Sequence, residues 1–283
     1  MSIKEAHITL LGKKINYASA GHGTPMIFLH NGGGFWQCWY HQMEQFKNTH
    51  TVYGIDWPNF GESDSGKELI SLEMLTNTLD EFIKTLQLEK VTLVGNCIGD
   101  SAALNYTKHN PDKVFKLILM NICPGRKIYS NKYIRRLIPA LNQHPKRKKI
   151  TEGVLKFAFT KTPIKRKFPS ILFGNNPDKE SFLFKKYQAK FKEKKQTNAR
   201  LNLVFSVHTF DIDLFMDHES IPEHLLLWGA NNKATPYESH GKYHAEFLGS
   251  ANFTLIPKGG HLCMYEYPEK VNGIIASYCN VTK

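Results

Sequence analysis

The sequence predicts an α/β fold in which helices cover both faces of a mostly parallel sheet. Short apolar runs of strand length alternate with segments of helical periodicity through 25–120 and again through 224–278. One apolar run is followed directly by a predicted helix, and Cys97 stands at their junction with a glycine two positions away on either side. The two alternating stretches are separated by an insertion that is basic and broken by prolines. Because strands that alternate with helices are typical of a parallel sheet, we expect an α/β core that is interrupted once.

The first half of the chain holds most of the expected strands. It begins with a hairpin around Gly12, after which buried strands recur along the chain. The expected strands are 6–10, 14–17, 25–30, 51–56, 90–94 and 114–120. A helix is expected over 69–86, where apolar residues recur every three or four positions, and another over 100–109, which Pro111 ends.

The insertion spans residues 126–217, and its composition is largely helical. Its pattern is broken at Pro145, Pro163, Pro169 and Pro177. After it, strands are expected at 224–228 and 253–256, with a helix from about 236 between them and a closing helix from 261 towards 278. We therefore expect an α/β core of residues 1–125 and 218–283, with a helical cap of residues 126–217 over its carboxyl edge.

The bulk composition is that of an ordinary globular protein. The 283 residues are 41% hydrophobic and 22% charged, and none of the apolar runs reaches the 18 residues of a membrane span. Because the first residues also lack the apolar stretch of a signal peptide, we expect a cytoplasmic protein without stable membrane insertion. The five cysteines are scattered without C-x-x-C spacing, which favours reduced thiols and predicts neither a metal site nor a cofactor.

Residues 95–99, Gly-Asn-Cys-Ile-Gly, carry the strongest indication of chemistry. Small residues two positions before and after Cys97 permit a sharp turn that would point its side chain outward at a helix N-terminus. A thiol at such a place ionises more easily than a free one. The pattern indicates a cysteine nucleophile held between a strand and a helix.

Four ordered motifs resemble those of the α/β-hydrolase superfamily with a helical cap. Residues 30–34 are similar to its His-Gly oxyanion segment, 56–64 to its D-x-P-G-x-G-x-S loop, 95–99 to its nucleophile elbow, and 260–261 to its late catalytic histidine. The resemblance covers roughly residues 5–125 and 220–283. It implies the fold more specifically than it implies a substrate.

Two departures from the family pattern occur together in the implied catalytic triad. The elbow carries Cys97 where the family usually has serine, and Asn232 stands where the family's acid is expected, with His261 as the base. A cysteine can pass its proton to histidine before the substrate arrives, so an amide can suffice to orient the ring, as in Cys-His-Asn proteases. Other candidates for the acid remain open, and they are Asp100, Asp211, Asp213 and Asp217. A triad-like set without turnover also remains open.

The residues around this set have expected roles as well. The backbone N–H groups of Ile98 and of Gly32 or Gly33 are the candidates for an oxyanion hole. His30 is expected to hold the glycine loop rather than to act in catalysis. Phe35 and Trp36 follow the loop and are expected either to line an acyl pocket or to pack in the core. The remaining cysteines near these motifs are expected to be small apolar fillers, and they are Cys38, Cys123 and Cys263.

The positive charge of the chain is concentrated in the cap. The formal net charge is +12, but residues 126–200 alone hold 22 Lys and Arg against four Asp and Glu, while the rest of the chain is acidic. A surface of one sign favours encounters with the opposite charge, so the cap indicates an anionic partner such as acyl carrier protein or coenzyme A. A solvated lysine-rich face is the plain alternative. No nucleic-acid partner is expected, because no reading motif accompanies the charge.

These observations together predict a cysteine-dependent acyl-transfer enzyme. It would act as thioesterase or acyltransferase on a small acyl thioester, through an acyl-Cys97 intermediate. An ester or lactone hydrolase similar to dienelactone hydrolase is the alternative enzyme, and a non-catalytic ligand-binding protein with the hydrolase shell is the alternative outside enzymes. Epoxide or haloalkane hydrolysis would ordinarily require aspartate at position 97.

Overall fold

The computed structural model of the chain describes residues 1–66, 68–129, 170–175, 177–217, 220–249 and 252–280, with scattered positions between 132 and 153. Most of 130–169, and with it the middle of the expected cap, lies outside the described residues. Lys148, part of the basic run 146–149, lies outside them too.

The described chain contains one sheet of eight strands in the order β1-β2-β4-β3-β5-β6-β7-β8. Only the pairings β1–β2 and β2–β4 are antiparallel, and the other neighbours run parallel. The prediction of a mostly parallel sheet is confirmed. The strands are β1 Lys4–Leu10, β2 Lys13–Gly21, β3 Thr24–Leu29, β4 His50–Ile55, β5 Val91–Gly95, β6 Val114–Met120, β7 Leu225–Gly229 and β8 Asn252–Ile256.

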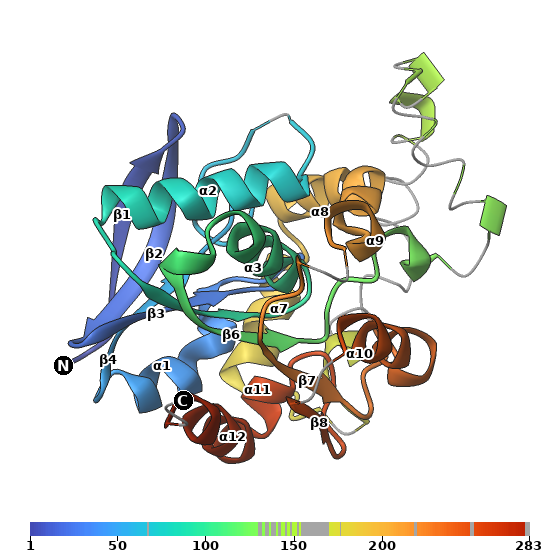
Figure 1. The fold of residues 1–283 in the computed structure, drawn as a ribbon. Coiled ribbons are helices and arrows are strands. Elements are labelled where there is room, and N and C mark those ends of the chain that lie inside the picture. The colour runs from blue at the N-terminus through green and yellow to red at the C-terminus, as the bar shows by residue number, and fades with distance from the viewer. Residues whose placement is uncertain are drawn as a thin grey trace.

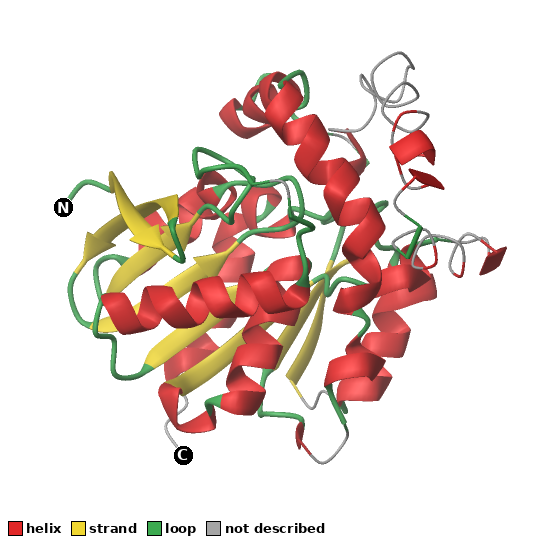
Figure 2. Ribbon diagram, turned by 90° about the horizontal axis from the view of Figure 1, so that it is seen from above, coloured by secondary structure: helices red, strands yellow, loops and turns green. Residues whose placement is uncertain are grey.

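Helices cover both faces of this sheet (Figure 1), and the view at right angles shows the twist of the strands beneath them (Figure 2). One face packs against α2 Leu72–Thr85, α3 Ile98–His109 and α10 Lys242–Leu248. The other packs against α1 Tyr40–Phe46, α11 Cys263–Glu266 and α12 Pro268–Asn280. The two buried apolar clusters between helices and sheet form the core.

The helix expected over 69–86 is α2, and its apolar face is buried as its spacing predicts. Leu75, Leu79 and Phe82 are fully buried against the sheet. The Ser71 side chain accepts a hydrogen bond from the Met74 N–H and so caps the first turn.

The closing helix is not continuous, which differs from the expectation for 261–278. It is divided into α11 and α12, and α12 begins at Pro268. Proline has no N–H to donate and its ring collides with the carbonyl one turn earlier, so it can begin a helix but not continue one.

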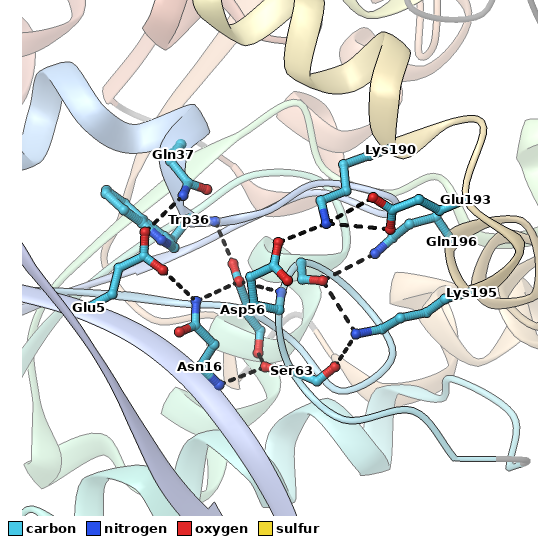
Figure 3. A network of polar contacts seen from close by, with 12 residues as sticks. Glu5, Asn16, Trp36, Gln37, Asp56, Ser63, Lys190, Glu193, Lys195 and Gln196 are labelled. Atoms are coloured by element: carbon cyan, nitrogen blue, oxygen red, sulfur yellow. Dashed lines mark hydrogen bonds and ion pairs between the residues drawn. The ribbon is translucent and has the colours of Figure 1, made fainter.

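Two described helices of the insertion, α7 Phe182–Lys190 and α8 Lys194–Ser206, contact loops that follow the carboxyl ends of strands. Lys190 Nζ donates to Glu62 at 2.7 Å, and Lys195 Nζ donates to the Ser63 carbonyl, both in the loop after β4 (Figure 3). The same loop is anchored below by Asp56, whose carboxylate accepts from the Trp36 N–H at 2.7 Å. These contacts place α7 and α8 over the carboxyl edge of the sheet.

The turn from β5 into α3 is packed so tightly that its two glycines have no room for a side chain. A Cβ on Gly95 would lie 2.5 Å from an Asp100 carboxylate oxygen, and one on Gly99 would lie 2.3 Å from the Leu29 carbonyl oxygen. The glycine spacing noted in the sequence therefore reflects close approach of α3 to strand β3.

We expect Gly99→Ala to destabilise the fold, because its methyl group would force β3 and α3 apart. Overpacking of this kind costs about 3 kcal/mol, which in a chain of this size lowers the melting temperature by roughly 6–12 °C. Thermal melts followed by circular dichroism measure this. The matched control is Gly273→Ala in α12, where nothing lies within 4 Å of the new Cβ and helix propensity favours alanine by about 1 kcal/mol. Equal melting temperatures for the two variants would contradict the steric argument.

Candidate active site

Cys97 lies at the N-terminal end of α3. Its backbone has φ 59° and ψ −112°, a conformation that residues other than glycine seldom adopt. Its N–H donates to the Met120 carbonyl at 3.0 Å and to the Asp100 carboxylate at 3.0 Å. Asp100 also accepts from the Met120 N–H at 3.0 Å, so it joins the elbow to strand β6. Strain of this kind persists only where the surroundings hold it, and here it points the thiol away from the sheet.

Three donors converge on the Cys97 sulfur. They are the Cys123 thiol, the His261 ring and the Gly32 backbone N–H. The hydrogen bond from Cys123 contributes most to lowering the pKa of Cys97 well below its ordinary value; burial opposes this shift, and His261 and Gly32 reinforce it. The N-terminus of α3 adds its dipole in the same direction. The site therefore favours a thiolate at position 97.

His261 is fixed from two sides. Its carbonyl oxygen accepts from the side-chain amides of Asn96 at 2.9 Å and Asn121 at 3.1 Å. Its Nδ1 lies 3.2 Å from Asn232 Nδ2 and 3.4 Å from Thr235 Oγ1. Since Nδ1 faces Asn232, the ring presents Nε2 to the Cys97 sulfur. The structure thus brings Cys97, His261 and Asn232 together, as expected from their order in the sequence.

The hydrogen bonds around Asn232 determine which way its amide points. Its Oδ1 accepts from the backbone N–H groups of Ala234 and Thr235, both at 3.0 Å. Its Nδ2 donates to Asn121 Oδ1 at 3.0 Å, and that oxygen already accepts from the Gly229 N–H at 2.9 Å. A flipped amide would set oxygen against oxygen and NH₂ against N–H, so the NH₂ group must face His261.

This orientation limits how the histidine is held. The Asn232 NH₂ has two protons for three acceptors, Thr235 Oγ1 at 2.8 Å, Asn121 Oδ1 at 3.0 Å and His261 Nδ1 at 3.2 Å. Where Nδ1 accepts from Asn232 the ring proton is on Nε2, facing the sulfur, and where Nδ1 donates to Thr235 Oγ1 at 3.4 Å the ring proton is on Nδ1. Asn232 therefore lies against the ring, as a Cys-His-Asn set requires, and the thiolate–imidazolium pair expected with it stays a prediction.

The candidate oxyanion donors lie in the glycine loop after β3 and at the start of α3. Gly32 faces the thiol, and a Cβ there would lie 2.5 Å from Leu203 of α8. Gly33 adopts φ +82°, with the Arg200 side chain lying over it. The Ile98 N–H, at the first position of α3, meets no acceptor among the described residues. The oxyanion hole expected from these N–H groups stays a prediction.

Comparison with known proteins agrees with this architecture. A family model for the alpha/beta hydrolase fold matches residues 24–268. The chain belongs to the α/β-hydrolase fold family. Epoxide hydrolase 4 of Mus musculus is similar, with 25% identity over 94% of this chain and 76% of its own length. The AB hydrolase superfamily protein YisY of Bacillus subtilis (strain 168) is also 25% identical, over 98% of this chain and 97% of its own.

Among solved structures, MGS-M2, an α/β hydrolase enzyme from a Medee basin deep-sea metagenome library, has the same fold. It superposes with a TM-score of 0.78 at 17% identity, covering 98% of each chain. At that identity the likeness concerns the fold of this α/β hydrolase and says nothing of its substrate.

None of the four aspartates considered as alternative acids contacts His261 in this α/β hydrolase. Asp100 is engaged with the backbone of the elbow, as described above. Asp211 accepts from the Arg126 N–H at 2.6 Å, Asp213 pairs with Lys127 at 2.8 Å, and Asp217 pairs with Lys108 at 2.9 Å. Asn232 is therefore the residue that occupies the acid position.

His30 holds the loop, as expected. Its Nδ1 donates to the Asn31 carbonyl at 2.7 Å, and its Nε2 accepts from the Trp57 N–H at 3.0 Å. Burial lowers the pKa of His30 to about 3, so the ring stays neutral. Asn31, which replaces the usual glycine, accepts from the Tyr187 hydroxyl of α7 at 3.0 Å and so ties the loop to the insertion.

The two aromatic residues expected in an acyl pocket lie in different places. Phe35 is buried, with its ring centroid 4.7 Å from that of Tyr187. Trp36 lines a surface groove of about 430 Å³ together with Glu5, Tyr40 and Phe182. Neither Cys97 nor His261 lines that groove, so Trp36 is on a different surface from the thiol.

Sequence analysis missed three residues that shape the site: Cys123, Asn121 and Thr235. Cys123 was expected to be a filler, yet its thiol contacts the nucleophile. Thr235 lies only three positions after Asn232 and accepts a hydrogen bond from its Nδ2 at 2.8 Å. Local contacts of this kind between a polar side chain and a nearby asparagine could have been considered from the sequence. No pattern in the sequence distinguished Asn121, because it acts through residues more than 100 positions away.

The His, Cys, Asp and Glu side chains of the described residues form no group of three that could hold a metal ion. Within the described ranges, no helix combines the length and the apolar character needed to cross a bilayer.

We expect Cys97 to react with iodoacetamide at pH values where free cysteine, with a pKa of about 8.5, is protonated. A hydrogen bond to a charged acceptor contributes about 1.5–3 kcal/mol, so Cys123→Ala should slow this alkylation about tenfold near pH 6. Cys123→Ser keeps a donor and should stay near wild type. Peptide mass mapping across pH 5–9 measures the rates. Identical profiles for the alanine and serine variants would contradict the role given to the Cys123 donor.

Proposed function

We propose that this α/β hydrolase is a cysteine-dependent acyl-transfer enzyme that moves an acyl group from a thioester through an acyl-Cys97 intermediate. The observation that supports this most strongly is the set of donors converging on the Cys97 sulfur, which favours its thiolate. A thiolate is the nucleophilic form of cysteine, and thioesters are the acyl donors matched to it.

In the first step the Cys97 thiolate attacks the acyl carbon and a C–S bond forms. The carbonyl oxygen becomes an oxyanion that accepts from the N–H groups of Ile98 and of Gly32 or Gly33. Each such donor typically lowers the barrier by about 3–4 kcal/mol. Collapse of the tetrahedral intermediate breaks the original C–S bond and leaves acyl-Cys97.

We propose the tautomer of His261 in which Nδ1 accepts from Asn232 and the ring proton is on Nε2, and this tautomer favours a leaving group that departs without a proton. Such a ring is not an efficient acid for an alkoxide. A thiolate leaves without protonation because its conjugate acid has a pKa of only about 8.5. This argument supports a thioester over the ester or lactone of a dienelactone-hydrolase type of reaction.

The same reasoning favours transfer over hydrolysis in the second step. Water must lose a proton as it attacks acyl-Cys97, and the Nε2–H of His261 faces that position instead of a free lone pair. A thiol acceptor can enter as its thiolate. We therefore infer exchange between two thiols as the main reaction.

The basic insertion supports an anionic carrier, such as acyl carrier protein or coenzyme A, as the source of the acyl group. Some of its lysines already bind the core, as Lys190 and Lys195 do. Lys146, Arg147 and Lys149 are exposed and could meet the phosphates or carboxylates of such a carrier.

Hydrolysis of a small acyl compound is the second candidate, and one contact favours it. Thr235 Oγ1 lies 3.4 Å from His261 Nδ1 and has a lone pair that can accept a proton from that nitrogen. The ring can then act as a base. Relatives whose names denote hydrolases, such as mouse epoxide hydrolase 4, support the same candidate.

Intact-mass spectrometry tests the proposed function. We expect mixing with acyl-coenzyme A to add the mass of the acyl group to the wild type and not to Cys97→Ala. A small uncharged thioester should acylate more slowly at low salt, and 0.5 M salt should reduce the difference because it screens the cap. Binding of an acyl ligand without any adduct, unchanged by Cys97→Ala, would instead indicate a non-catalytic binding protein.

A second prediction concerns Asn232→Asp. A carboxylate facing Nδ1 would hold a proton there and free Nε2 to act as a general base, a form of catalysis worth 10²-fold or more, so hydrolysis of acyl-Cys97 should accelerate by at least about tenfold. Single-turnover deacylation followed by mass measures this. Asn232→Ala, which removes the amide without adding a charge, is the matched control. Equal deacylation rates in the two variants would contradict the tautomer assignment.

A further inference from the structure

A second thiol lies against the nucleophile. Cys97 follows β5 and Cys123 follows β6, and these strands are parallel neighbours, so both cysteines lie at the same edge of the sheet. The Cys123 N–H donates to the Cys97 carbonyl at 3.3 Å, and the Cys123 thiol donates to the Cys97 sulfur. Neighbouring strands lie about 4.7–4.9 Å apart in the hydrogen-bonding direction, a separation compatible with the Cα distances of about 4.4–6.8 Å over which disulfides form.

We propose that Cys97 and Cys123 form a reversible oxidation site, in which a hydroperoxide oxidises Cys97 and Cys123 then closes a disulfide with it. The inference rests on the two neighbouring strands that bring Cys97 and Cys123 together and on the backbone hydrogen bond between them, and it does not require that Cys97 transfers acyl groups.

The reaction proceeds in two balanced steps. The Cys97 thiolate attacks the outer oxygen of the hydroperoxide, an S–O bond forms, the O–O bond breaks, and the departing alkoxide or hydroxide takes a proton from solvent. The Cys123 sulfur then attacks the sulfenic sulfur of Cys97. The S–S bond forms, the S–O bond breaks, and the released hydroxide leaves as water with the Cys123 proton. Overall, two thiols are oxidised by two electrons and one hydroperoxide is reduced to an alcohol and water.

The surroundings determine which cysteine reacts first. Cys97 is 9% exposed and Cys123 only 2%. Donors converge on the Cys97 sulfur, whereas the hydrogen bond to Cys97 and burial raise the pKa of Cys123 well above its ordinary value. The peroxide therefore meets a thiolate at Cys97 and a protonated, covered thiol at Cys123.

Oxidation of Cys97 then changes the state of Cys123. The negative charge that keeps Cys123 protonated is lost when Cys97 becomes a sulfenic acid, and with it the largest cause of the raised pKa. Cys123 becomes more acidic only after its neighbour has been oxidised, so it is prepared to attack at that moment.

The other cysteines near the core face different groups. Asn121 Nδ2 donates to the Cys263 sulfur at 3.8 Å, and burial raises the pKa of Cys263 to about 12. Cys38 is fully buried on the opposite face of the sheet. The pairing of Cys97 with Cys123 is therefore specific among the thiols of this region.

A disulfide between Cys97 and Cys123 would block the reaction of Cys97 and would also protect its sulfur from further oxidation. It takes the Cys97 sulfur out of reach of acyl donors, and it prevents the further oxidation to a sulfinic acid that thiols cannot reverse. Reduction by two equivalents of a small thiol restores both cysteines.

Tryptic mass mapping of the oxidised wild type tests the proposal directly. Cleavage places Cys97 in 91–108, Cys123 in 117–126 and Cys263 in 259–270, so each cysteine has its own peptide. After one equivalent of hydrogen peroxide we expect a loss of about 2 Da, a bridge between 91–108 and 117–126, and return of the original mass with dithiothreitol. A bridge to 259–270, or no bridge at all, would overturn the proposal.

Variants distinguish protection by Cys123 from simple oxidation. In Cys123→Ser two equivalents of hydrogen peroxide should instead add two oxygens, about 32 Da, to 91–108, irreversibly, because no partner traps the sulfenic acid after the first oxidation. Cys279→Ser, which leaves the site unchanged, should bridge as the wild type does. Reversible recovery of full mass in Cys123→Ser would contradict the assignment. Since the readout is mass, a failed acyl-transfer assay leaves this result unaffected.

Discussion

The left-handed backbone of Cys97 is the constraint on which the site depends. Residues with side chains resist a φ of 59°, so the surrounding structure must hold it. Gly95 and Gly99 let α3 approach β3 closely, and Asp100 accepts backbone N–H groups from both sides of the turn. This packing directs one sulfur to the N-terminus of α3, where backbone dipoles and N–H groups act on it. The packing that holds the strained backbone of Cys97 therefore also places its sulfur where nearby groups can stabilise a thiolate.

A second constraint, the orientation of the Asn232 amide, determines what this thiol can do. The amide is held by the backbone of Thr235 and by Asn121, whose own oxygen is held by Gly229. Together these groups place the Asn232 NH₂ against His261. A hydrogen-bond network in the loop after β7 thus positions the amide that faces the histidine ring.

The parts of this structure that could be predicted from sequence are those encoded by neighbouring residues. Strands, the amphipathic α2 and the elbow at 95–99 depend on local periodicity and on glycine spacing, and the structure has them. The break at Pro268 was visible locally but was overlooked in a long apolar pattern. The contact between Cys97 and Cys123 could not be predicted, because it depends on the register of β5 against β6 across 26 residues. The direction of the Asn232 amide depends on Asn121 in the same way.

The two departures from the family pattern are physically linked. A serine at position 97 would need a base to take its proton, since its hydroxyl does not ionise near neutral pH, and a His261 ring in the proposed tautomer, with its proton on Nε2, cannot be that base. A cysteine needs no such base once other donors stabilise its thiolate, and Cys123 and Gly32 supply them. In that tautomer, asparagine at 232 suits a thiol at 97 better than a serine. Conversely, a carboxylate at 232 would favour an imidazolium and pair it with the thiolate, so that the leaving thiolate would compete with Cys97 for one proton. In the proposed thiol exchange, the combination of Cys97 and Asn232 would keep the charge on sulfur through both halves of the reaction.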